Sequence, residues 1–159
     1  MNNKNAKPIA ILLVEDNPGD VRLTREALRD ARVRNTMHTV GDGVEALAFL
    51  RQEGRYAGEL RPDLILLDLN LPRMNGFELL QAIKTNDSFK LIPVVILTTS
   101  QAEQDIVKGY DLHANAYVTK PVDLEQFIHV IKSIEDFWLE IVRLPEVKSA
   151  TGPLSRDES

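Results

Sequence analysis

Four short apolar runs that end in polar side chains constrain the fold of this chain more than any other feature. They cover Ile9–Val14, Leu64–Leu67, Pro93–Leu97 and Ala116–Val118. Their length and their branched residues are typical of strands that are buried on both faces of a parallel sheet. The segments between them have apolar residues at helical spacing. Strands that alternate with helices predict parallel pairing, right-handed helical crossovers and helices on both faces of the sheet.

The whole pattern predicts an α/β fold with five strands and five helices. The strands are expected near residues 9–14, 35–40, 64–68, 93–97 and 116–118, and the helices near 18–31, 42–50, 75–83, 103–110 and 122–143. Residues 54–62 are expected to form a loop. The apolar stripes on the helices include Leu23, Val44 and Phe77. Such a doubly wound, flavodoxin-like sheet has the order 2-1-3-4-5, and its ligand crevice opens between strands one and three, where the chain reverses direction.

Polar residues follow the apolar runs at the point where each predicted strand ends. Glu15 and Asp16 follow the first run, Asp68 follows the run at 64–67, Thr98 follows the run at 93–97, and Thr119 and Lys120 follow the last run. Because the carboxyl ends of parallel strands meet at one edge of a sheet, these side chains are expected to lie close together. Carboxylates in such proximity repel one another, so the arrangement requires positive charge, which Mg²⁺ and Lys120 can supply. The alternative is an acidic rim that water solvates.

The composition narrows the possible classes of protein. The chain has 159 residues, enough for one domain, and no cysteine, which excludes disulfides, thiolate catalysis and cysteine-based zinc sites. Its net charge of -5 argues against a large nucleic-acid footprint. No apolar stretch approaches the ~20 residues of a membrane span, and the first residues lack the apolar segment of a secretory signal. We therefore expect a soluble cytoplasmic protein with one domain at residues 8–144, between a polar tail at 1–7 and a flexible tail at 145–159.

Taken together, these residues resemble the receiver domain of two-component response regulators, the CheY-like family. The resemblance rests on Glu15-Asp16, the motif from Leu66 to Gly76, Thr98, and the segment from Tyr117 to Pro121, and it covers residues 9–143. It implies that Asp68 accepts a phosphoryl group from a histidine kinase. It also implies an Mg²⁺ ion held by the carboxylates of Asp16 and Asp68 and by the backbone carbonyl of Asn70. Glu15 would act mainly through a metal-bound water.

The same resemblance assigns roles to three further residues. Lys120 pairs with Asp68 and then with a phosphoryl oxygen, and a cis peptide bond between Lys120 and Pro121 aims its side chain at the pocket. Thr98 is the switch hydroxyl that moves toward the phosphoryl group, and Tyr117 is the aromatic partner that changes orientation. From the residues alone, Thr99 remains a second candidate for the switch hydroxyl, and Thr98 and Tyr117 also fit ordinary strand positions.

The predicted C-terminal helix carries more apolar surface than covering the sheet requires. Phe137 and Trp138 are large side chains to leave in water, and Ile141 follows them one turn later. Because exposed aromatic patches mark interfaces, we expect a homodimer that uses these three residues. The alternative is that they pack on the core of their own domain. The stretch from Phe137 to Pro145 also resembles the ending of small response regulators that partner bacterial phytochromes, and the opening from Glu15 to Asp20 fits the same subgroup.

The expected function is that of a stand-alone signalling switch rather than a metabolic enzyme. The fifteen residues from Pro145 to Ser159 are too few for a DNA-binding or catalytic output domain. The alternative is a Mg²⁺-dependent phosphohydrolase that forms an aspartyl-phosphate. Such enzymes place a second acid two residues after the nucleophile, where this chain has Asn70. A phosphate-independent interaction module is a third possibility, against which the complete set of pocket residues argues.

Overall fold

The computed structural model describes residues 8–30, 34–109, 114–123 and 125–130. The chain divides into two units, Met1–Phe127 and Ile128–Ser159, and the sheet and the candidate site both lie in the first. The two predicted tails lie outside the described residues, as does the predicted C-terminal helix beyond residue 130 with Phe137, Trp138 and Ile141.

The first unit is built around a five-stranded sheet in which every pairing is parallel. Its strands are β1 (Ile9–Val14), β2 (Asn35–Val40), β3 (Leu64–Asp68), β4 (Val94–Thr98) and β5 (Ala116–Thr119). Their order is β2-β1-β3-β4-β5, which confirms the predicted doubly wound topology. Val14 of β1 pairs with Leu67 of β3, so the residues that follow each of them, Glu15 and Asp68, stand level at the carboxyl edge.

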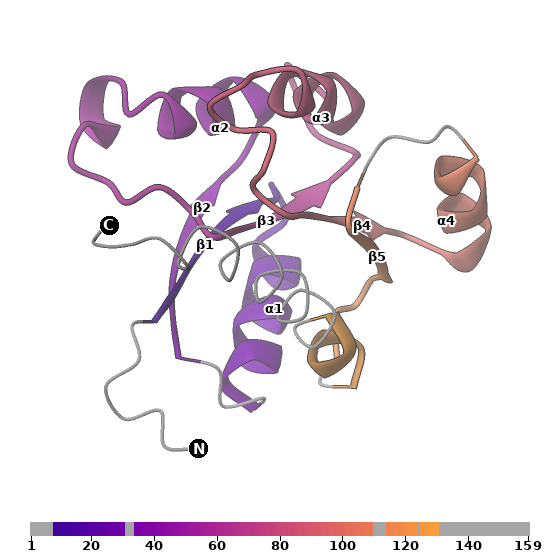
Figure 1. Cartoon of the computed structure of the whole chain (residues 1–159). Helices are drawn as coiled ribbons and strands as arrows, with labels where there is room; N and C mark the ends of the chain where they lie inside the picture. The colour runs from indigo at the N-terminus through magenta and orange to yellow at the C-terminus, as the bar shows by residue number, and fades with distance from the viewer. Residues whose placement is uncertain (1–7, 31–33, 110–113, 124, 131–159) are drawn as a thin grey trace, which may run out of the picture. The chain divides into compact units, whose positions relative to one another are not determined.

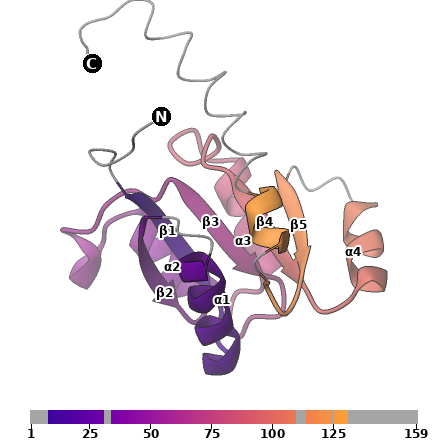
Figure 2. The ribbon, with the colours of Figure 1, turned by 90° about the horizontal axis from the view of Figure 1, so that it is seen from below.

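Helices cover both faces of this sheet. They are α1 (Pro18–Asp30), α2 (Gly43–Leu50), α3 (Gly76–Lys84) and α4 (Gln101–Lys108), with a short 3₁₀ helix, η1 (Gly54–Tyr56). Figures 1 and 2 show α1 on one face, α2 and α3 on the other, and α4 beside β5 at the edge of the sheet. The segment predicted as a loop therefore contains one helical turn. Among the described residues, no helix is long and apolar enough to cross a membrane.

Three of the helices begin at residues that cap them. Asp42 caps α2 by accepting from the amide of Glu45, and Asn75 forms a capping box with Glu78 at the start of α3. Ser100 caps α4 by accepting from the amide of Glu103. The predicted start of α4 at residue 103 was therefore too late by two residues, because the apolar spacing does not include the turn that the serine initiates.

The core comes from the strands and from one side of each helix. In α1 the buried side chains are Thr24, Ala27 and Leu28, and in α3 they are Leu79, Leu80 and Ile83. Leu23, Val44 and Phe77, which belong to the apolar stripes predicted from spacing, are instead 39%, 43% and 40% exposed. They lie one to three positions from the residues that face the sheet, so the buried stripe is narrower than the apolar one.

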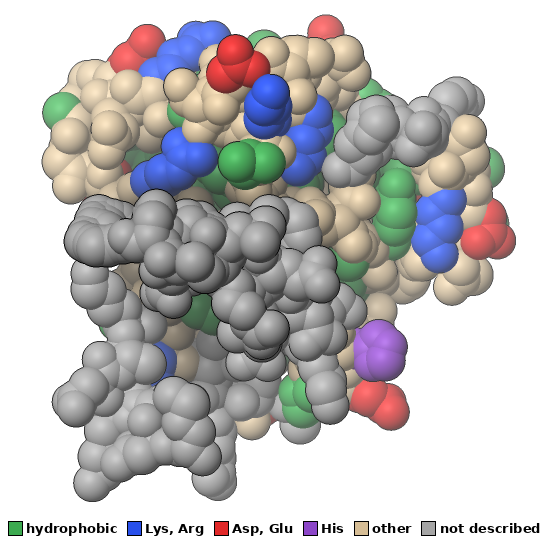
Figure 3. All heavy atoms as spheres, viewed as in Figure 1, with side chains coloured by type: hydrophobic (Ala, Val, Ile, Leu, Met, Phe, Trp, Pro, Cys, Tyr) green, Lys and Arg blue, Asp and Glu red, His purple; other side chains and the backbone are tan. Residues whose placement is uncertain are grey.

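The outer surface of the helical layer carries mixed charge. Figure 3 shows Lys and Arg side chains next to Asp and Glu side chains over α2 and α3. This mixture agrees with the sequence, which has a net charge of -5 and therefore no excess of basic residues.

Candidate functional site

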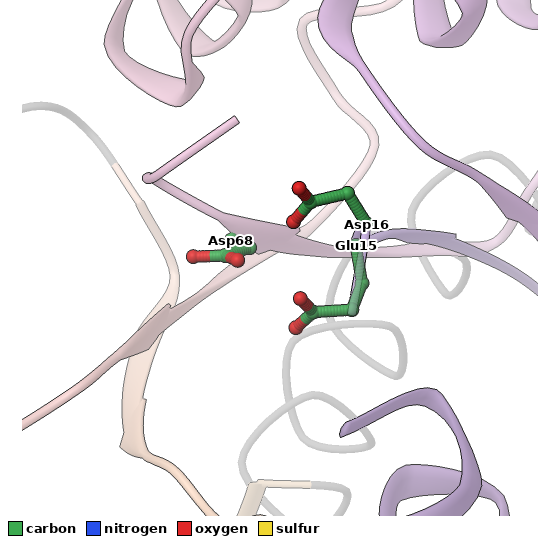
Figure 4. A group of neighbouring side chains, drawn as sticks. All are labelled: Glu15, Asp16 and Asp68. Atoms are coloured by element: carbon green, nitrogen blue, oxygen red, sulfur yellow. The ribbon is translucent and has the colours of Figure 1, made fainter. Parts of the chain in front are cut away.

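Three carboxylates gather at the carboxyl edge of the sheet, at the switch point between β1 and β3. Glu15 and Asp16 follow β1 directly, and Asp68 is the last residue of β3. Each can offer one oxygen such that all three oxygens lie within 4.8 Å of one another. In Figure 4 the carboxylates of Glu15 and Asp16 point toward the side of the view that Asp68 occupies. Glu15 and Asp68 are both 2% exposed, whereas Asp16 is open to solvent.

The ammonium group of Lys120 lies in the same crevice and neutralises part of this charge. Its Nζ is 3.2 Å from Oε1 of Glu15 and 3.2 Å from Oδ2 of Asp68. It is also 2.9 Å from Oδ2 of Asp20, in the first turn of α1. The sequence predicted that Lys120 would meet Asp68, but it gave Asp20 no role, because Asp20 does not follow a strand.

Burial and the charge of Asp68 raise the pKa of Glu15, and the neighbouring charges raise the pKa of Lys120 despite its burial. Burial, followed by the negative charge of Asp68 and a hydrogen bond to it, raises the pKa of Glu15 to about 7. Burial lowers the pKa of Lys120, but its hydrogen bond to Asp20 and the charges of Asp68 and Glu15 outweigh burial and raise the pKa above its ordinary value. The carboxylates of the crevice carry more negative charge than a single lysine neutralises. The crevice therefore favours the binding of a further cation.

The Asp68 carboxylate is oriented by the loop that follows it. The backbone amide of Asn70 donates to Oδ1 of Asp68 over 3.1 Å, which leaves Oδ2 for Lys120. The loop then returns to start α3, where the amide of Gly76 donates to the carbonyl of Leu69. A side chain at position 76 would place its Cβ 2.5 Å from Cα of Leu69 and 2.7 Å from the carbonyl oxygen of Asp68. Glycine is therefore required for the backbone to approach so closely.

The same loop is fixed to the start of α2. Arg73, whose φ of 62° lies in the left-handed region, places its Nε 3.3 Å from Oδ2 of Asp42. The amide of Gly43 donates to the carbonyl of Met74 over 3.2 Å, and a Cβ at Gly43 would meet that oxygen at 2.5 Å. One backbone hydrogen bond and one ion pair thus fix the loop that carries Asn70 to the start of α2.

The residues predicted to act as the switch lie on the β4–β5 side of the crevice. Thr98 is fully buried, and its Oγ1 donates to the carbonyl of Val118 over a long 3.4 Å. Thr99 is exposed, and both its amide and its hydroxyl donate to Oε1 of Glu103. The ring of Tyr117 is half-buried, with Nζ of Lys108 5.6 Å from its centroid. The peptide bond between Lys120 and Pro121 is cis, which is the isomer that the family resemblance implies.

The acidic cluster has the donor set of a site for a hard divalent cation. All three side chains offer carboxylate oxygen, which Mg²⁺ and similar ions prefer over nitrogen or sulfur. Asp16 is exposed, so an ion bound there can keep several of its waters. The raised pKa of Glu15 is a second sign of fit, because burial and the negative charge of Asp68 both disfavour its ionised form, and a bound cation would offset this effect.

A parallel sheet of order 2-1-3-4-5, with acids at the switch point and a lysine from the last strand, defines a CheY-like receiver. The chain also matches the family model described as response regulator receiver domain over residues 11–132. The chain belongs to the response regulator receiver family.

The chain is also similar to individual response regulators. Response regulator Rcp1 of Synechocystis sp. is 46% identical over 145 residues, which are 91% of this chain and 99% of Rcp1. The structure of the phosphorylated cyanobacterial phytochrome response regulator RcpA has 53% identity and a TM-score of 0.68, covering 84% of this chain and 95% of RcpA. The Mn²⁺-bound form of Rcp1 has 47% identity and a TM-score of 0.66, covering 84% of this chain and 96% of that one.

Proposed function

We propose that this receiver takes a phosphoryl group from a histidine kinase onto Asp68 and signals through the change in shape that follows. One observation carries the proposal: a buried carboxylate at the switch point, 3.2 Å from a lysine ammonium and clustered with two further acids. In the transfer, Oδ2 of Asp68 forms a bond to phosphorus while the bond from phosphorus to the donor nitrogen breaks and the imidazole leaves. The product is an acyl phosphate.

The residues that would hold a divalent cation are Asp16 and Asp68 through their carboxylates and Asn70 through its backbone carbonyl, with Glu15 acting through a bound water. Mg²⁺ is our choice of ion, since hard oxygen ligands with retained waters suit it, and the Mn²⁺-bound relative supports a divalent cation at such a site. When bound, the ion supplies positive charge that offsets the phosphoryl oxygens as they enter an acidic pocket. Lys120 supplies the rest.

We further propose that Thr98 and Tyr117 convert the chemical change into a surface change. The 3.4 Å bond from Thr98 to Val118 is long for a hydroxyl donor, so little is lost when the hydroxyl turns toward a phosphoryl oxygen. The movement of Thr98 would open space into which the ring of Tyr117 could turn. The two residues then form a two-state element that phosphorylation biases.

The proposed kinase partner is a bacterial phytochrome or a kinase related to one. This part rests on RcpA, a phytochrome response regulator that is 53% identical to this chain. A homodimer through Phe137, Trp138 and Ile141 remains a proposal from the sequence. The switch function is preferred to a phosphohydrolase because position 70, where a second acid would promote turnover, is asparagine.

The test is to incubate the full chain with acetyl phosphate and Mg²⁺ and to read the intact mass. We expect one phosphoryl group per chain in the presence of Mg²⁺ and almost none after chelation, because the pocket is too acidic to admit the group without a cation. Acetate released per chain is measured in parallel. A chain that gains no mass with Mg²⁺, or one that hydrolyses hundreds of acetyl phosphates, would contradict the proposed switch.

Lys120→Met is expected to bind Mg²⁺ about tenfold more tightly and to take up phosphoryl groups about tenfold more slowly. The first effect follows because the ammonium group repels a divalent cation from the same carboxylates, and the second because the phosphoryl oxygens lose a partner. Calorimetric titration measures the first and intact mass at saturating Mg²⁺ the second. Lys90→Met, which changes an exposed lysine paired with Asp87, is the control. Unchanged Mg²⁺ affinity in the Lys120 variant would show that the ammonium does not share the cation site.

A further inference from the structure

The shortest of the three ion pairs that the Lys120 ammonium group makes is with a residue outside the acidic cluster. Its Nζ lies 2.9 Å from Oδ2 of Asp20, compared with 3.2 Å from Glu15 and from Asp68. A lysine ammonium has three N–H donors, so each donor has one carboxylate. Asp20 is not among the residues whose oxygens form the cation cluster, which are Glu15, Asp16 and Asp68.

Asp20 is held in place by α1 independently of the cluster. Its backbone amide donates to Oδ1 of Asn17 over 3.0 Å, and its carbonyl accepts from the hydroxyl of Thr24 over 2.9 Å. Thr24 is 2% exposed, so this turn of α1 is anchored in the core. A carboxylate in the first turn of a helix is also favoured by the helix dipole. Both anchoring bonds use backbone atoms of Asp20, so its carboxylate needs no rearrangement to bind Lys120.

The three carboxylates around Lys120 differ in what happens to them during phosphorylation. Asp68 becomes an acyl phosphate, so the oxygen that accepts from Lys120 changes its charge and its position. Glu15 belongs to the cluster that is assigned to the cation. Of the three, Asp20 alone is assigned neither role, so its bond to Lys120 can persist through the whole cycle.

We propose that Asp20 is a positioning residue that holds the Lys120 ammonium at the phosphoryl oxygens while the other partners of Lys120 change. This inference rests on the proposed phosphoacceptor function of Asp68 and adds a residue to that site. Without Asp20, the lysine would lose the one partner that orients it from outside the reacting groups. A flexible side chain that must be ordered at the moment of transfer slows the transfer.

Asp20→Asn is expected to lower the rate constant of phosphoryl uptake from acetyl phosphate by roughly threefold to tenfold at saturating Mg²⁺. Asn keeps the size of the side chain and both backbone anchors but removes its charge. Asp30→Asn, which makes the same charge change at the exposed far end of α1, is expected to behave as the wild type. Asp20→Glu, which restores the charge, is expected to retain more of the rate than Asp20→Asn.

A double-mutant cycle separates positioning from a general structural effect. In a Lys120→Met background, Asp20→Asn is expected to cause no further loss, because the residue acts through the lysine. An equal loss in both backgrounds, or an Asp20→Asn variant as fast as or faster than the wild type, would overturn the inference. The mobility of the Lys120 side chain, measured by NMR relaxation with Mg²⁺ bound, is a second readout. It is expected to increase in Asp20→Asn, and unchanged mobility would overturn the inference too.

The result for the wild type separates a failure of this inference from a failure of the function on which it rests. If the wild type takes up no phosphoryl group, both the proposed function and the role of Asp20 fail. If the wild type is phosphorylated and Asp20→Asn matches it, only the role of Asp20 fails.

Discussion

Asp68→Asn is expected to take up no phosphoryl group under conditions in which the wild type is labelled. Asparagine has the size of aspartate and can still accept the hydrogen bond from the amide of Asn70. Its side chain is neutral and has no carboxylate oxygen to bond to phosphorus. The expected loss is therefore complete rather than partial, and it comes without a change in the shape of the pocket.

The folded state of this variant should be at least as stable as the wild type. Asp68 is buried, and its charge is one of the causes that raise the pKa of Glu15 to about 7. Removing a like charge from a desolvated pair relieves repulsion, and Lys120 keeps Glu15 and Asp20 as partners. Chemical denaturation without added metal measures this effect, and it excludes misfolding as the cause of lost labelling.

The control for this prediction is another aspartate that is remote from the crevice. Asp87→Asn removes a carboxylate that pairs with Lys90 at the surface, and it should be labelled as the wild type is. Peptide mapping of the labelled wild type should place the adduct on Asp68. A phosphoryl adduct of normal yield on the Asp68 variant would mean that another residue is the acceptor.

Gly76→Ala is expected to reduce the free energy of unfolding by about 2–3 kcal/mol. The added Cβ would lie 2.5 Å from Cα of Leu69 and 2.7 Å from the carbonyl oxygen of Asp68. Both contacts are with backbone, which cannot move aside as the tip of a side chain can. Leu69 is itself buried, and its carbonyl accepts from the amide of position 76, so the loop is restrained from both ends.

Gly58→Ala provides the matched comparison, because a Cβ at that position meets nothing within 4 Å. Its effect on unfolding free energy should stay within about 0.5 kcal/mol. Urea titration of both variants gives the two values. Equal stability of the two variants would show that the loop can shift to accommodate a methyl group. Since the same clash displaces the backbone of Asp68, Gly76→Ala should also slow phosphoryl uptake.

The strand-end residues could be predicted from the sequence because they depend on a short-range rule. Each apolar run ends within one residue of the end of its strand. Parallel strands bring those ends to one edge, so the places of Glu15, Asp68 and Lys120 follow directly. The N-caps Asp42 and Asn75 were also recognisable, since a polar residue before an apolar helical stripe marks a start. These features belong to local sequence and to topology, and they require no knowledge of side-chain packing.

Other features depend on packing and could not be predicted in the same way. Asp20 looks like an ordinary acid in the first turn of a helix, and only the placement of α1 against the crevice brings it to Lys120. Phe77 is apolar and at helical spacing, yet it lies on the solvent side of α3. The ion pair between Arg73 and Asp42 joins two loops that are separate in the sequence. In each case, the outcome depends on how elements that are separate in the sequence are placed in the fold.

The two walls of the crevice are held by different kinds of bond. The wall toward α2 is held by the Arg73–Asp42 pair and by the bond from Gly43 to Met74. The wall toward α4 is held by side-chain bonds from Thr119 to Gln104 and from Thr99 to Glu103. The hydroxyl of Thr98 makes one long bond to the carbonyl of Val118. On the α4 side, the hydroxyl of Thr98 can turn toward a phosphoryl oxygen without breaking a backbone hydrogen bond. We therefore expect the output of this switch to leave through α4 and β5, while the α2 side serves as the rigid support against which it acts.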